Sequence, residues 1–289
     1  MFSQLEGKKV VVFGGTGFIG SQLVYKLCKE SCQVDIITRK INVKKRFFSA
    51  GEPGQISTKK IEFFDEKNLE ILLKDANIVF NLIGILNESK NTSFNFVHTE
   101  IPKMIAKVAA KMKVRSFLHL SALNIEKVKK SLYAQSKLNG EMQIKKYFPN
   151  AIIIRPSVVF GKGDKFTNLF YNISKFSPFL PIIGTPKVDF WRGFLPKIDF
   201  GKKVRFQPLY IGDLVDYLLI ISNKKNRSYD LAGPNIRTFR QIFDIILSAK
   251  NKKRIYLPIP FFIAEILGFF FSLLPKPLLT SDQIISPKN

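Results

Sequence analysis

The fold is decided by a stretch near the start of the chain, which reads Lys9-Val10-Val11-Val12-Phe13-Gly14-Gly15-Thr16-Gly17-Phe18-Ile19-Gly20. A short β-branched run, clustered glycines and then apolar residues at one-turn spacing predict a buried strand, a tight turn and a helix. We expect Gly14 to permit the turn, Gly17 to let the backbone approach a pyrophosphate, and Gly20 to let the helix lie close to the sheet. The helix would direct its free N–H groups and positive dipole end at the phosphates.

This stretch is interpreted as a dinucleotide cradle, the alternative being a merely structural strand-to-helix turn. The residues assigned to the cradle are Gly14, Thr16, Gly17, Phe18, Ile19 and Gly20. The expected fold class is α/β, a Rossmann-like doubly wound parallel sheet with a smaller C-terminal cap lobe.

The composition is that of a globular chain of 289 residues, long enough to bury a sizeable core. The chain has 46 basic and 22 acidic residues, a net charge of +24 that is spread along its length. Two explanations stay open, a compositional bias of the source genome and a polyanionic partner surface. No nucleic-acid-binding motif accompanies the charge, so the anionic surface of a membrane is the polyanion expected as a partner.

The sequence carries few signals of export, metal binding or membrane insertion. Cys28 and Cys32 lie four apart without a disulfide framework or metal-ligand spacing, so we expect reduced, packed thiols and no metal site. The first strand begins by Lys9, which leaves no room before it for a signal peptide. No run of 18 apolar residues is present, so a spanning helix is not expected. These features indicate a cytoplasmic location, with peripheral attachment to the inner face of the bacterial cytoplasmic membrane also open.

The end of the second predicted strand, Gln33–Arg39, is the position that decides cofactor preference. A carboxylate there would bind the adenosine ribose of NAD(H), but this chain has Thr38, Arg39 and Lys40. A hydroxyl and two cations suit a 2′-phosphate, so the sequence favours NADP(H) over NAD(H). Ordinary solvated basic residues are the alternative explanation.

The third and fourth predicted strands supply further candidates. Lys60–Phe64 is predicted to be a strand that ends at Asp65, which could accept from the adenine amino group or cap the following helix. Ile78–Ile83 is predicted to be a strand that ends in Asn81-Leu82-Ile83-Gly84, at the carboxyl edge where an open parallel sheet places its ligand. We expect Gly84 to let the backbone pass beside the cofactor.

A possible catalytic group follows. After a predicted helix from about Thr99 to Met112, the strand Ser116–Leu120 delivers Ser121. Tyr133 and Lys137 lie four apart on the next helix and therefore share a face. A nearby cation lowers the pKa of a phenol, which makes Tyr133 a candidate general acid or base, and Ser121 could bind the same substrate oxygen. Taken alone, a Tyr and a Lys at this spacing also arise by chance.

The predicted domains divide the chain near its middle. Residues 1–161 are expected to form the NAD(P)-binding domain, ending with Arg155-Pro156 and the residues up to Gly161. Residues 162–289 are expected to be a mixed region with a smaller cap lobe, of which 207–234 return to the main sheet. Asp213 and Thr238 are predicted to cap helices.

These motifs together resemble the extended and atypical short-chain dehydrogenase/reductases over nearly the whole chain. They are the cradle, Asn81–Gly84, Ser121, Tyr133 with Lys137, Arg155–Gly161 and Gln207–Asp213. Within that superfamily, one branch is most similar, the NADPH-binding accessory subunit of respiratory complex I and its bacterial relatives. The similarity to it lies in Asn81–Gly84, the short interval from Ser121 to Tyr133, Lys137–Glu141, Arg205–Pro208 and Leu278–Gln283.

The resemblance implies a seven-stranded parallel sheet and a tightly held NADPH. The further cofactor contacts it implies are Leu82, Ile83, Gly84, Tyr133, Lys137 and Pro156. It also implies attachment beside a membrane complex, with the dinucleotide in a structural or sensing role. It leaves catalysis open, because the complex I subunit is similar in its Tyr and Lys yet is not regarded as turning over a substrate. Residues 187–203 look like an insertion relative to that branch, and the chain stops soon after Gln283.

Three functions from different classes follow. The first is a non-catalytic NADPH-binding accessory or assembly factor of respiratory complex I at the membrane face. The second is an NADP-dependent reductase, epimerase or dehydratase acting on a nucleotide-sugar, isoprenoid or quinone-pathway intermediate. The third is a redox sensor without membrane attachment. Phe190–Lys197 and Ile259–Leu274 are aromatic or apolar segments that suit a membrane surface, or alternatively pack as the cap of the small lobe.

Overall fold

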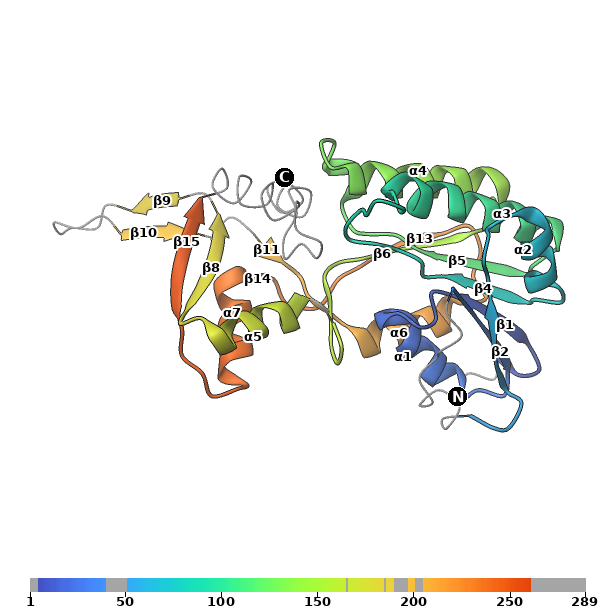
Figure 1. Ribbon diagram of the computed structural model, residues 1–289, viewed down its shortest axis with the longest axis horizontal. Coiled ribbons are helices and arrows are strands. Elements are labelled where there is room, and N and C mark those ends of the chain that lie inside the picture. The colour runs from blue at the N-terminus through green and yellow to red at the C-terminus, as the bar shows by residue number, and fades with distance from the viewer. Residues whose placement is uncertain are drawn as a thin grey trace. The chain divides into compact units, whose positions relative to one another are not determined.

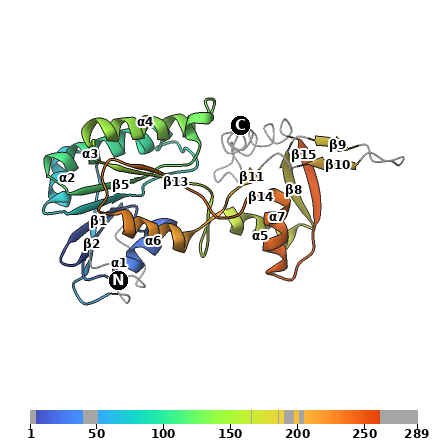
Figure 2. The same ribbon diagram turned by 180° about the vertical axis from the view of Figure 1, so that it is seen from behind.

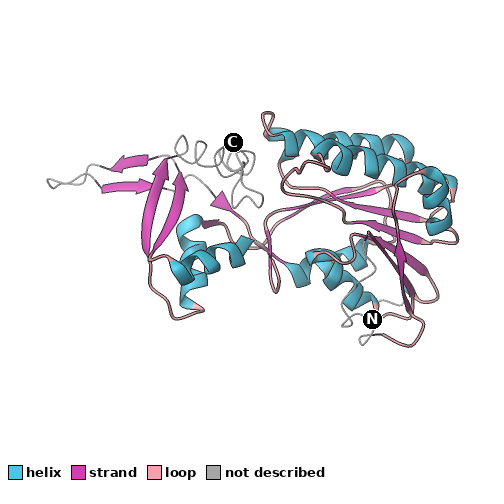
Figure 3. Cartoon of the chain, viewed as in Figure 1, coloured by secondary structure: helices cyan, strands magenta, loops and turns pink. Residues whose placement is uncertain are grey.

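The computed structural model describes residues 5–39, 51–164, 166–184, 186–189, 197–200 and 205–260 (Figure 3). The described residues form two compact units. The first takes those within Met1–Glu126, Tyr133–Pro156 and Tyr210–Leu231, and the second takes those within Lys127–Leu132, Ser157–Leu209 and Ala232–Asn289. Both candidate site regions of the sequence, the cradle and the Tyr133–Lys137 turn, lie in the first unit.

The first unit is built on a seven-stranded sheet of order β13-β6-β5-β4-β1-β2-β3 (Figure 1). Every neighbouring pair is parallel. The strands are β1 (Lys9–Phe13), β2 (Gln33–Thr38), β3 (Ile56–Lys60), β4 (Ile78–Asn81), β5 (Ser116–Leu120), β6 (Ile152–Pro156) and β13 (Ser228–Leu231). The order reverses between β1 and β4, which makes the carboxyl ends of these two strands the expected ligand edge. The predicted α/β doubly wound fold is confirmed.

Helices cover both faces of this sheet (Figures 1 and 2). One face carries α1 (Phe18–Leu27) and α6 (Ile211–Ile221), and the other carries α2 (Glu66–Leu73), α3 (Ile101–Lys111) and α4 (Leu132–Tyr147). The strands are apolar on both sides because both faces are buried. Alternate residues of β1 therefore enter different cores. Val11 and Phe13 pack in the core with Ile105 of α3 and Ile144 of α4.

Two short helical segments connect these elements. A π-helix, η3 (Phe96–Glu100), runs directly into α3, and a 3₁₀ turn, η4 (Ile125–Lys127), precedes α4. The predicted single helix from Thr99 to Met112 is therefore wrong at its start, because the helical path begins at Phe94 and is widened for one turn at Phe96–Glu100. A π-helical turn is rare and occurs mostly as a single widened turn within an α-helix, frequently at functional sites.

The predicted third strand, Lys60–Phe64, is wrong. The strand is β3, Ile56–Lys60, which pairs with β2 in the register Val34↔Ile56 to Thr38↔Lys60. It lies at the edge of the sheet, so few of its side chains are buried and its sequence lacks the apolar run that predicted a strand. The run that follows does not enter the sheet core as a strand, and Phe63 within it is 70 % exposed.

The predicted cap at Asp213 is also wrong, because α6 begins three residues earlier than expected at Ile211 and Tyr210 is its N-cap. Asp213 lies in the first turn, where a carboxylate still interacts favourably with the helix dipole. The predicted cap at Thr238 is confirmed: its side chain accepts from Gln241 N, and Gln241 reaches back to Thr238 N, forming a capping box. Cys28 and Cys32 are free and buried, as expected.

The second unit combines two helices with short strands. Its elements are β7 (Val159–Phe160), α5 (Phe166–Phe176), β8 (Phe179–Gly184), β9 (Pro186–Asp189), β10 (Lys197–Phe200), β11 (Arg205–Phe206), β12 (Leu209–Tyr210, at the boundary), β14 (Arg237–Thr238), α7 (Phe239–Ser248) and β15 (Ile255–Pro260). β8 pairs with β15 in parallel, β9 with β10 and β11 with β14 antiparallel. Phe170 and Phe243 join α5 to α7, their ring centroids 4.6 Å apart. The proposed insertion at 187–203 thus contributes to the antiparallel pair β9–β10.

Several predicted segments lie wholly or partly outside the described residues. They are Lys40, the stretch 190–196 of the first aromatic segment, 201–203 of the insertion, the part of the apolar segment after Pro260, and Leu278–Gln283. Ile259 and Pro260 themselves belong to β15 and do not start a helix. Within the described ranges, no helix is long and apolar enough to cross a membrane.

Candidate functional site

The cradle is a turn of backbone between β1 and α1. Gly14 has φ +78°, a conformation that residues with a Cβ rarely adopt, and the N–H of Gly17 donates to Gly14 O at 3.0 Å. Gly17 is the N-cap of α1 and no side chain caps the helix. The first turn of α1 carries no acidic residue either. The helix start therefore presents backbone N–H groups and the positive end of its dipole without a counter-charge of its own.

The glycines of the cradle leave no room for side chains. A Cβ at Gly20 would lie 2.1 Å from Gly14 O and 2.7 Å from Gly15 Cα. A Cβ at Gly14 would lie 3.0 Å from the carbonyl of Leu82, in the segment that follows β4. The ends of β1 and β4 thus approach in backbone-to-backbone contact. This contact places Leu82, Ile83 and Gly84 beside the cradle at the sheet edge where a ligand is expected.

Lys137 connects α4 to the end of β5. It is buried, and its ammonium group donates to the carbonyl oxygen of Leu120 at 3.0 Å. Burial lowers the pKa of Lys137 to about 8, although Glu141 acts in the opposite direction. Gly84 lies close by, since a Cβ built on it would be 3.4 Å from Lys137 Nζ. The structure therefore brings the ammonium group to the predicted cofactor segment.

Tyr133 and Ser121 lie at the same edge. The Tyr133 ring contacts the rings of Phe94 and His98 edge-on, with centroids 5.7 and 5.2 Å away. Ser121 follows β5 and its backbone N–H donates to Ile154 O at 2.7 Å. The hydroxyl of Ser121 is buried and has no hydrogen-bond partner within the described part of the chain. An unsatisfied buried hydroxyl and an uncapped glycine turn are what a polar ligand at this edge would complete, so the residues present fit a dinucleotide.

His98 is a buried residue of the candidate site that the sequence patterns did not reveal. It lies in the π-helix η3 and is fully buried. Its Nε2 accepts from the backbone N–H of Ile85 at 3.1 Å, and its Nδ1 lies 3.0 Å from the hydroxyl of Ser136. Burial, followed by the nearby charge of Lys137, lowers the pKa of His98 to about 3. The imidazole is therefore neutral and acts as a fixed acceptor and donor between two segments of the site.

His119 is the second buried imidazole. It lies in β5 beside Asn81 of β4, whose side-chain Nδ2 is 3.1 Å from His119 Nδ1. Asn81 Oδ1 accepts from Ile83 N, which fixes the amide so that it donates to the imidazole. His119 Nε2 then carries the proton, and it has no partner within the described residues. Burial first, then the charge of Lys137, holds the pKa of His119 well below its usual range.

One sequence signal could have found one of these two residues. His119 interrupts the predicted apolar strand Ser116–Leu120. A polar side chain inside a buried strand needs a partner, so His119 indicates a polar interior at this edge. No comparable pattern surrounds His98. Within the described residues no cluster of three or more His, Cys, Asp or Glu could hold a metal ion.

The sequence profile of the NAD dependent epimerase/dehydratase family matches residues 10–232, which include the cradle and the Tyr133–Lys137 turn. The chain belongs to this family. The described first unit, with its parallel sheet and glycine cradle, is the architecture that such a dinucleotide-binding family requires.

Relatives of known name extend over most of the chain. It is 29 % identical over 288 residues to NADH dehydrogenase [ubiquinone] 1 alpha subcomplex subunit 9, mitochondrial, of Mus musculus, covering 98 % of this chain and 72 % of that protein. It is 26 % identical over 286 residues to the NADH-ubiquinone oxidoreductase 40 kDa subunit, mitochondrial, of Neurospora crassa, covering 98 % and 71 %. The ceramide reductase of Caulobacter vibrioides is 27 % identical over 174 residues, which are 60 % of this chain and 53 % of that enzyme.

Solved structures agree on the fold. The epimerase Mth375 of Methanothermobacter thermautotrophicus superposes with a TM-score of 0.68 at 20 % identity, covering 90 % of this chain and 82 % of that one. UDP-glucose 4-epimerase of Thermus thermophilus, solved in complex with NAD, gives a TM-score of 0.67 at 15 % identity, covering 87 % and 86 %. At these identities the likeness shows the family fold alone.

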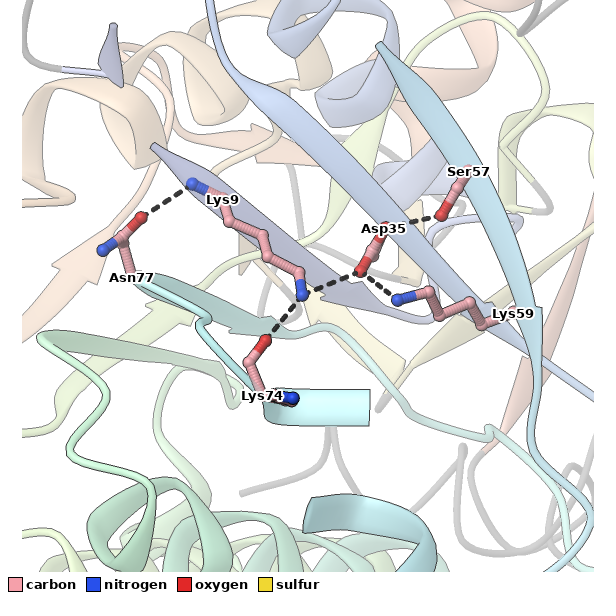
Figure 4. A network of polar contacts seen from close by, with 6 residues as sticks. All are labelled: Lys9, Asp35, Ser57, Lys59, Lys74 and Asn77. Carbon is pink, nitrogen blue, oxygen red and sulfur yellow. Dashed lines mark hydrogen bonds and ion pairs between the residues drawn. The ribbon is translucent and has the colours of Figure 1, made fainter. Parts of the chain in front are cut away.

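Within this epimerase/dehydratase fold, the end of β2 has no carboxylate. Thr38 is partly buried and Arg39 is exposed at that end. The acidic residue of β2, Asp35, lies three residues before Thr38, where it is opposite Val11 of β1 and contacts Lys9, Ser57 and Lys59 (Figure 4). Its carboxylate binds Ser57 Oγ at 2.5 Å and the ammonium groups of Lys59 and Lys9 at 2.7 and 3.7 Å. The Asp35 carboxylate is thus part of an ion network with Lys9 and Lys59.

Two other predicted residues have local structural partners. Asp65 is the N-cap of α2, because its Oδ1 accepts a hydrogen bond from Asn68 N at 2.8 Å. Of the two roles left open for Asp65, adenine contact and helix cap, the structure shows the helix cap. Pro156 is buried and its carbonyl accepts from Leu123 N at 3.0 Å. This bond holds the chain that leaves Ser121 against the end of β6.

Proposed function

We propose that this protein binds NADP(H) in preference to NAD(H) at the carboxyl edge of β1 and β4. The cradle residues would hold the pyrophosphate, and Thr38, Arg39 and Lys40 would hold the 2′-phosphate. Leu82, Ile83 and Gly84, with Tyr133, Lys137 and Pro156, would line the nicotinamide half. The observation that carries this proposal is the start of α1 at the glycine turn, where no side chain caps the backbone N–H groups and the first helical turn has no acidic residue.

We propose further that the protein serves as an accessory or assembly factor of respiratory complex I at the membrane face. The support is the similarity over 98 % of this chain to subunits that carry the names of complex I proteins. A bound dinucleotide in that role would stabilise the fold and report the redox state, without a substrate.

A catalytic function is the second candidate, favoured by one observation. Ser121, with its unsatisfied buried hydroxyl, comes together with Tyr133 and the buried Lys137 at one sheet edge. When bound, the dinucleotide would supply or accept a hydride. Tyr133 would exchange the proton with a substrate oxygen that Ser121 holds, and Lys137 would favour the phenolate. The substrate classes we propose are nucleotide-sugar, isoprenoid and quinone-pathway intermediates.

The cofactor proposal is tested by identifying the nucleotide released from the purified, denatured chain. We expect NADPH or NADP⁺, and we expect a Gly20→Ala variant that still folds to release none. Release of NAD(H) alone would reverse the proposed preference. An empty protein that binds neither nucleotide on titration would contradict the dinucleotide site.

The accessory role is tested in cells that lack the protein, by measuring NADH:quinone oxidoreductase activity of their membranes and the size of assembled complex I. We expect both to fall and to be restored by the unmodified chain and by Tyr133→Phe. Normal complex I in these cells would contradict the accessory role. Turnover of a carbonyl substrate that Tyr133→Phe abolishes would establish the catalytic alternative.

A further inference from the structure

Several cations converge on one tyrosine in the second unit. The ammonium groups of Lys175, Lys250 and Lys252 lie 4.7, 5.3 and 5.9 Å from the ring centroid of Tyr171. Arg254 lies next to them, because its Nε donates to the carbonyl of Ser174, one residue before Lys175, at 2.9 Å. We call Tyr171, Lys175, Lys250, Lys252 and Arg254 the basic patch.

The backbone holds these side chains on one side of the unit. The N–H groups of Lys250 and Lys252 both donate to Leu247 O, at 3.0 and 2.9 Å, which closes a tight turn after α7. Asn251 between them has φ 50°, the left-handed conformation that such a turn requires. β8 and β15 are parallel, so the α5–β8 and α7–β15 connections lie at the same end of this pair (Figure 1). The fold thus brings the side chains of the basic patch together from two chain segments that are distant in sequence.

The positive charge of the patch is not neutralised by acidic side chains. No ion pair involves Lys175, Lys250, Lys252 or Arg254 within the described residues. The acid of α7, Asp244, accepts instead from the Tyr256 hydroxyl. The C-terminal end of α5 contributes about half a negative charge, which is far less than four cations. The patch therefore presents a concentrated positive potential that attracts anions.

Apolar side chains border the patch and are open to solvent. Phe176, the residue after Lys175, is 91 % exposed, more than any other large apolar residue that is described. Phe179 and Ile255, partners in the β8–β15 register, are 47 % and 62 % exposed. Aromatic rings beside lysines and arginines suit the headgroup layer of a bilayer, where rings enter the interface and cations meet phosphates.

We propose that the basic patch and Phe176 form the surface by which this protein docks on a membrane, binding the phosphates of anionic phospholipid headgroups. The proposal rests on the membrane-face location given under Proposed function and names the surface responsible. A nucleic acid would also satisfy the cations, but it would leave Phe176, Phe179 and Ile255 without an apolar partner at the edge of the patch. The combination of charge and exposed apolar surface favours the bilayer.

The test is sedimentation of the full chain with phosphatidylcholine vesicles that contain or lack about 30 % phosphatidylglycerol. The patch variant is Lys175→Gln/Lys250→Gln/Lys252→Gln, and Phe176→Ser tests the apolar part. The matched control is Lys67→Gln/Lys224→Gln/Lys225→Gln, which removes the same charge from exposed lysines of the first unit. Thermal unfolding and NADPH binding of each variant show that the fold and the cradle are intact.

We expect the unmodified chain to bind only the vesicles that contain phosphatidylglycerol, and to bind them less tightly as salt is added. The patch variant should reduce this binding about tenfold or more, and Phe176→Ser should also reduce it. The control variant should bind nearly as well as the unmodified chain. If the patch and control variants lose vesicle binding equally, the patch is not the docking surface, although the proposed membrane location still stands. If the unmodified chain binds no vesicles, both the docking surface and the membrane location are overturned. Inorganic phosphate and a short DNA duplex are added as competitors at equal phosphate concentration. If either displaces the vesicles and Phe176→Ser has no effect on binding, the bilayer is overturned as the partner. NADPH binding is measured on every variant. If it persists where vesicle binding is lost, the docking proposal has failed and the cofactor proposal has not.

Discussion

His98 Nδ1 and Ser136 Oγ are joined by a hydrogen bond of 3.0 Å between the π-helix η3 and the first turn of α4. Because the backbone N–H of Ile85 can only donate, it fixes the lone pair on Nε2 and leaves the proton on Nδ1. Ser136 Oγ accepts from Nδ1 and donates its own hydrogen bond to the carbonyl oxygen of Tyr133 at 2.8 Å. One neutral imidazole thereby ties the segment after β4 to the helix turn that carries Tyr133 and Lys137.

This arrangement predicts an acid-sensitive fold. The pKa of His98 is about 3 in the folded protein and near 6.5 when unfolded, so between these values the unfolded chain binds the extra proton. Stability therefore decreases as pH falls below about 6.5, by roughly 1 kcal/mol per pH unit from His98 and a similar amount from His119. Urea unfolding between about pH 6.5 and 5 measures this slope.

The variant His98→Gln removes one of the two titrating groups. We expect it to lower the slope by about half while it also lowers stability at neutral pH, since the Ile85 or the Ser136 hydrogen bond is lost. Comparing slopes rather than absolute stabilities keeps the two effects apart. An unchanged slope would mean that His98 is protonated in the folded protein.

The cradle predicts a sharp contrast between two glycine substitutions. Gly20→Ala would place a methyl group 2.1 Å from Gly14 O, so either the turn or α1 must shift and NADPH affinity should fall by at least tenfold. Gly84→Ala would place its methyl group 3.4 Å from Lys137 Nζ, an ordinary contact, so the empty protein should keep its stability while the methyl group takes space beside the cofactor and lowers NADPH affinity. Gly20→Ala should lower both stability and affinity. Fluorescence titration with NADPH and urea unfolding of the empty protein measure the two effects. Equal stability of the two variants would show that the close packing at Gly20 does not constrain the cradle.

Cofactor preference is predicted to depend on Arg39. A charge-assisted hydrogen bond to a 2′-phosphate contributes about 1.5–3 kcal/mol, so Arg39→Ala should weaken NADPH binding roughly ten- to a hundredfold. NADH binding should hardly change, because NADH lacks that phosphate. Lys67→Ala, on the exposed surface of α2, is the control for loss of one positive charge. Similar affinities for NADPH and NADH in the unmodified chain would refute the preference for NADP(H).

The part of the fold that the sequence predicted well is the part where periodicity and glycine geometry act locally. The strand, turn and helix of the cradle and the strands at Gln33, Ile78 and Ser116 are confirmed within two residues. The edge strand β3 was missed because its side chains are only partly buried, so no apolar alternation marks it. The π-helix at Phe96 was missed because it differs from an α-helix by one hydrogen-bond step, which no residue pattern encodes.

The polar interior of the site was less predictable, because its contacts join segments far apart in sequence. Arg155 and Glu141 belong to two quoted motifs, yet only the structure shows that they form a two-bond ion pair, with Nε 2.9 Å from Oε1 and Nη2 2.5 Å from Oε2. This pair joins β6 to α4 and raises the pKa of Arg155. Arg155 and Glu141 therefore have a structural role in their motifs, because they pair with each other and hold α4, the helix that carries Lys137, against β6.

Lys137 gives the last prediction, in which stability and ligand binding have opposite pH dependences. Its pKa is about 8 in the folded chain and near 10.5 when unfolded, so the empty protein should become more stable as pH rises between these values. If the ammonium group binds the dinucleotide, NADPH affinity should instead fall above about pH 8, approaching tenfold per pH unit, as the proton is lost. Lys137→Met should remove both trends. NADPH titrations and urea unfolding from about pH 7 to 10 measure them on the same samples. An affinity that stays constant across this range in the unmodified chain would exclude contact between the Lys137 ammonium and the cofactor.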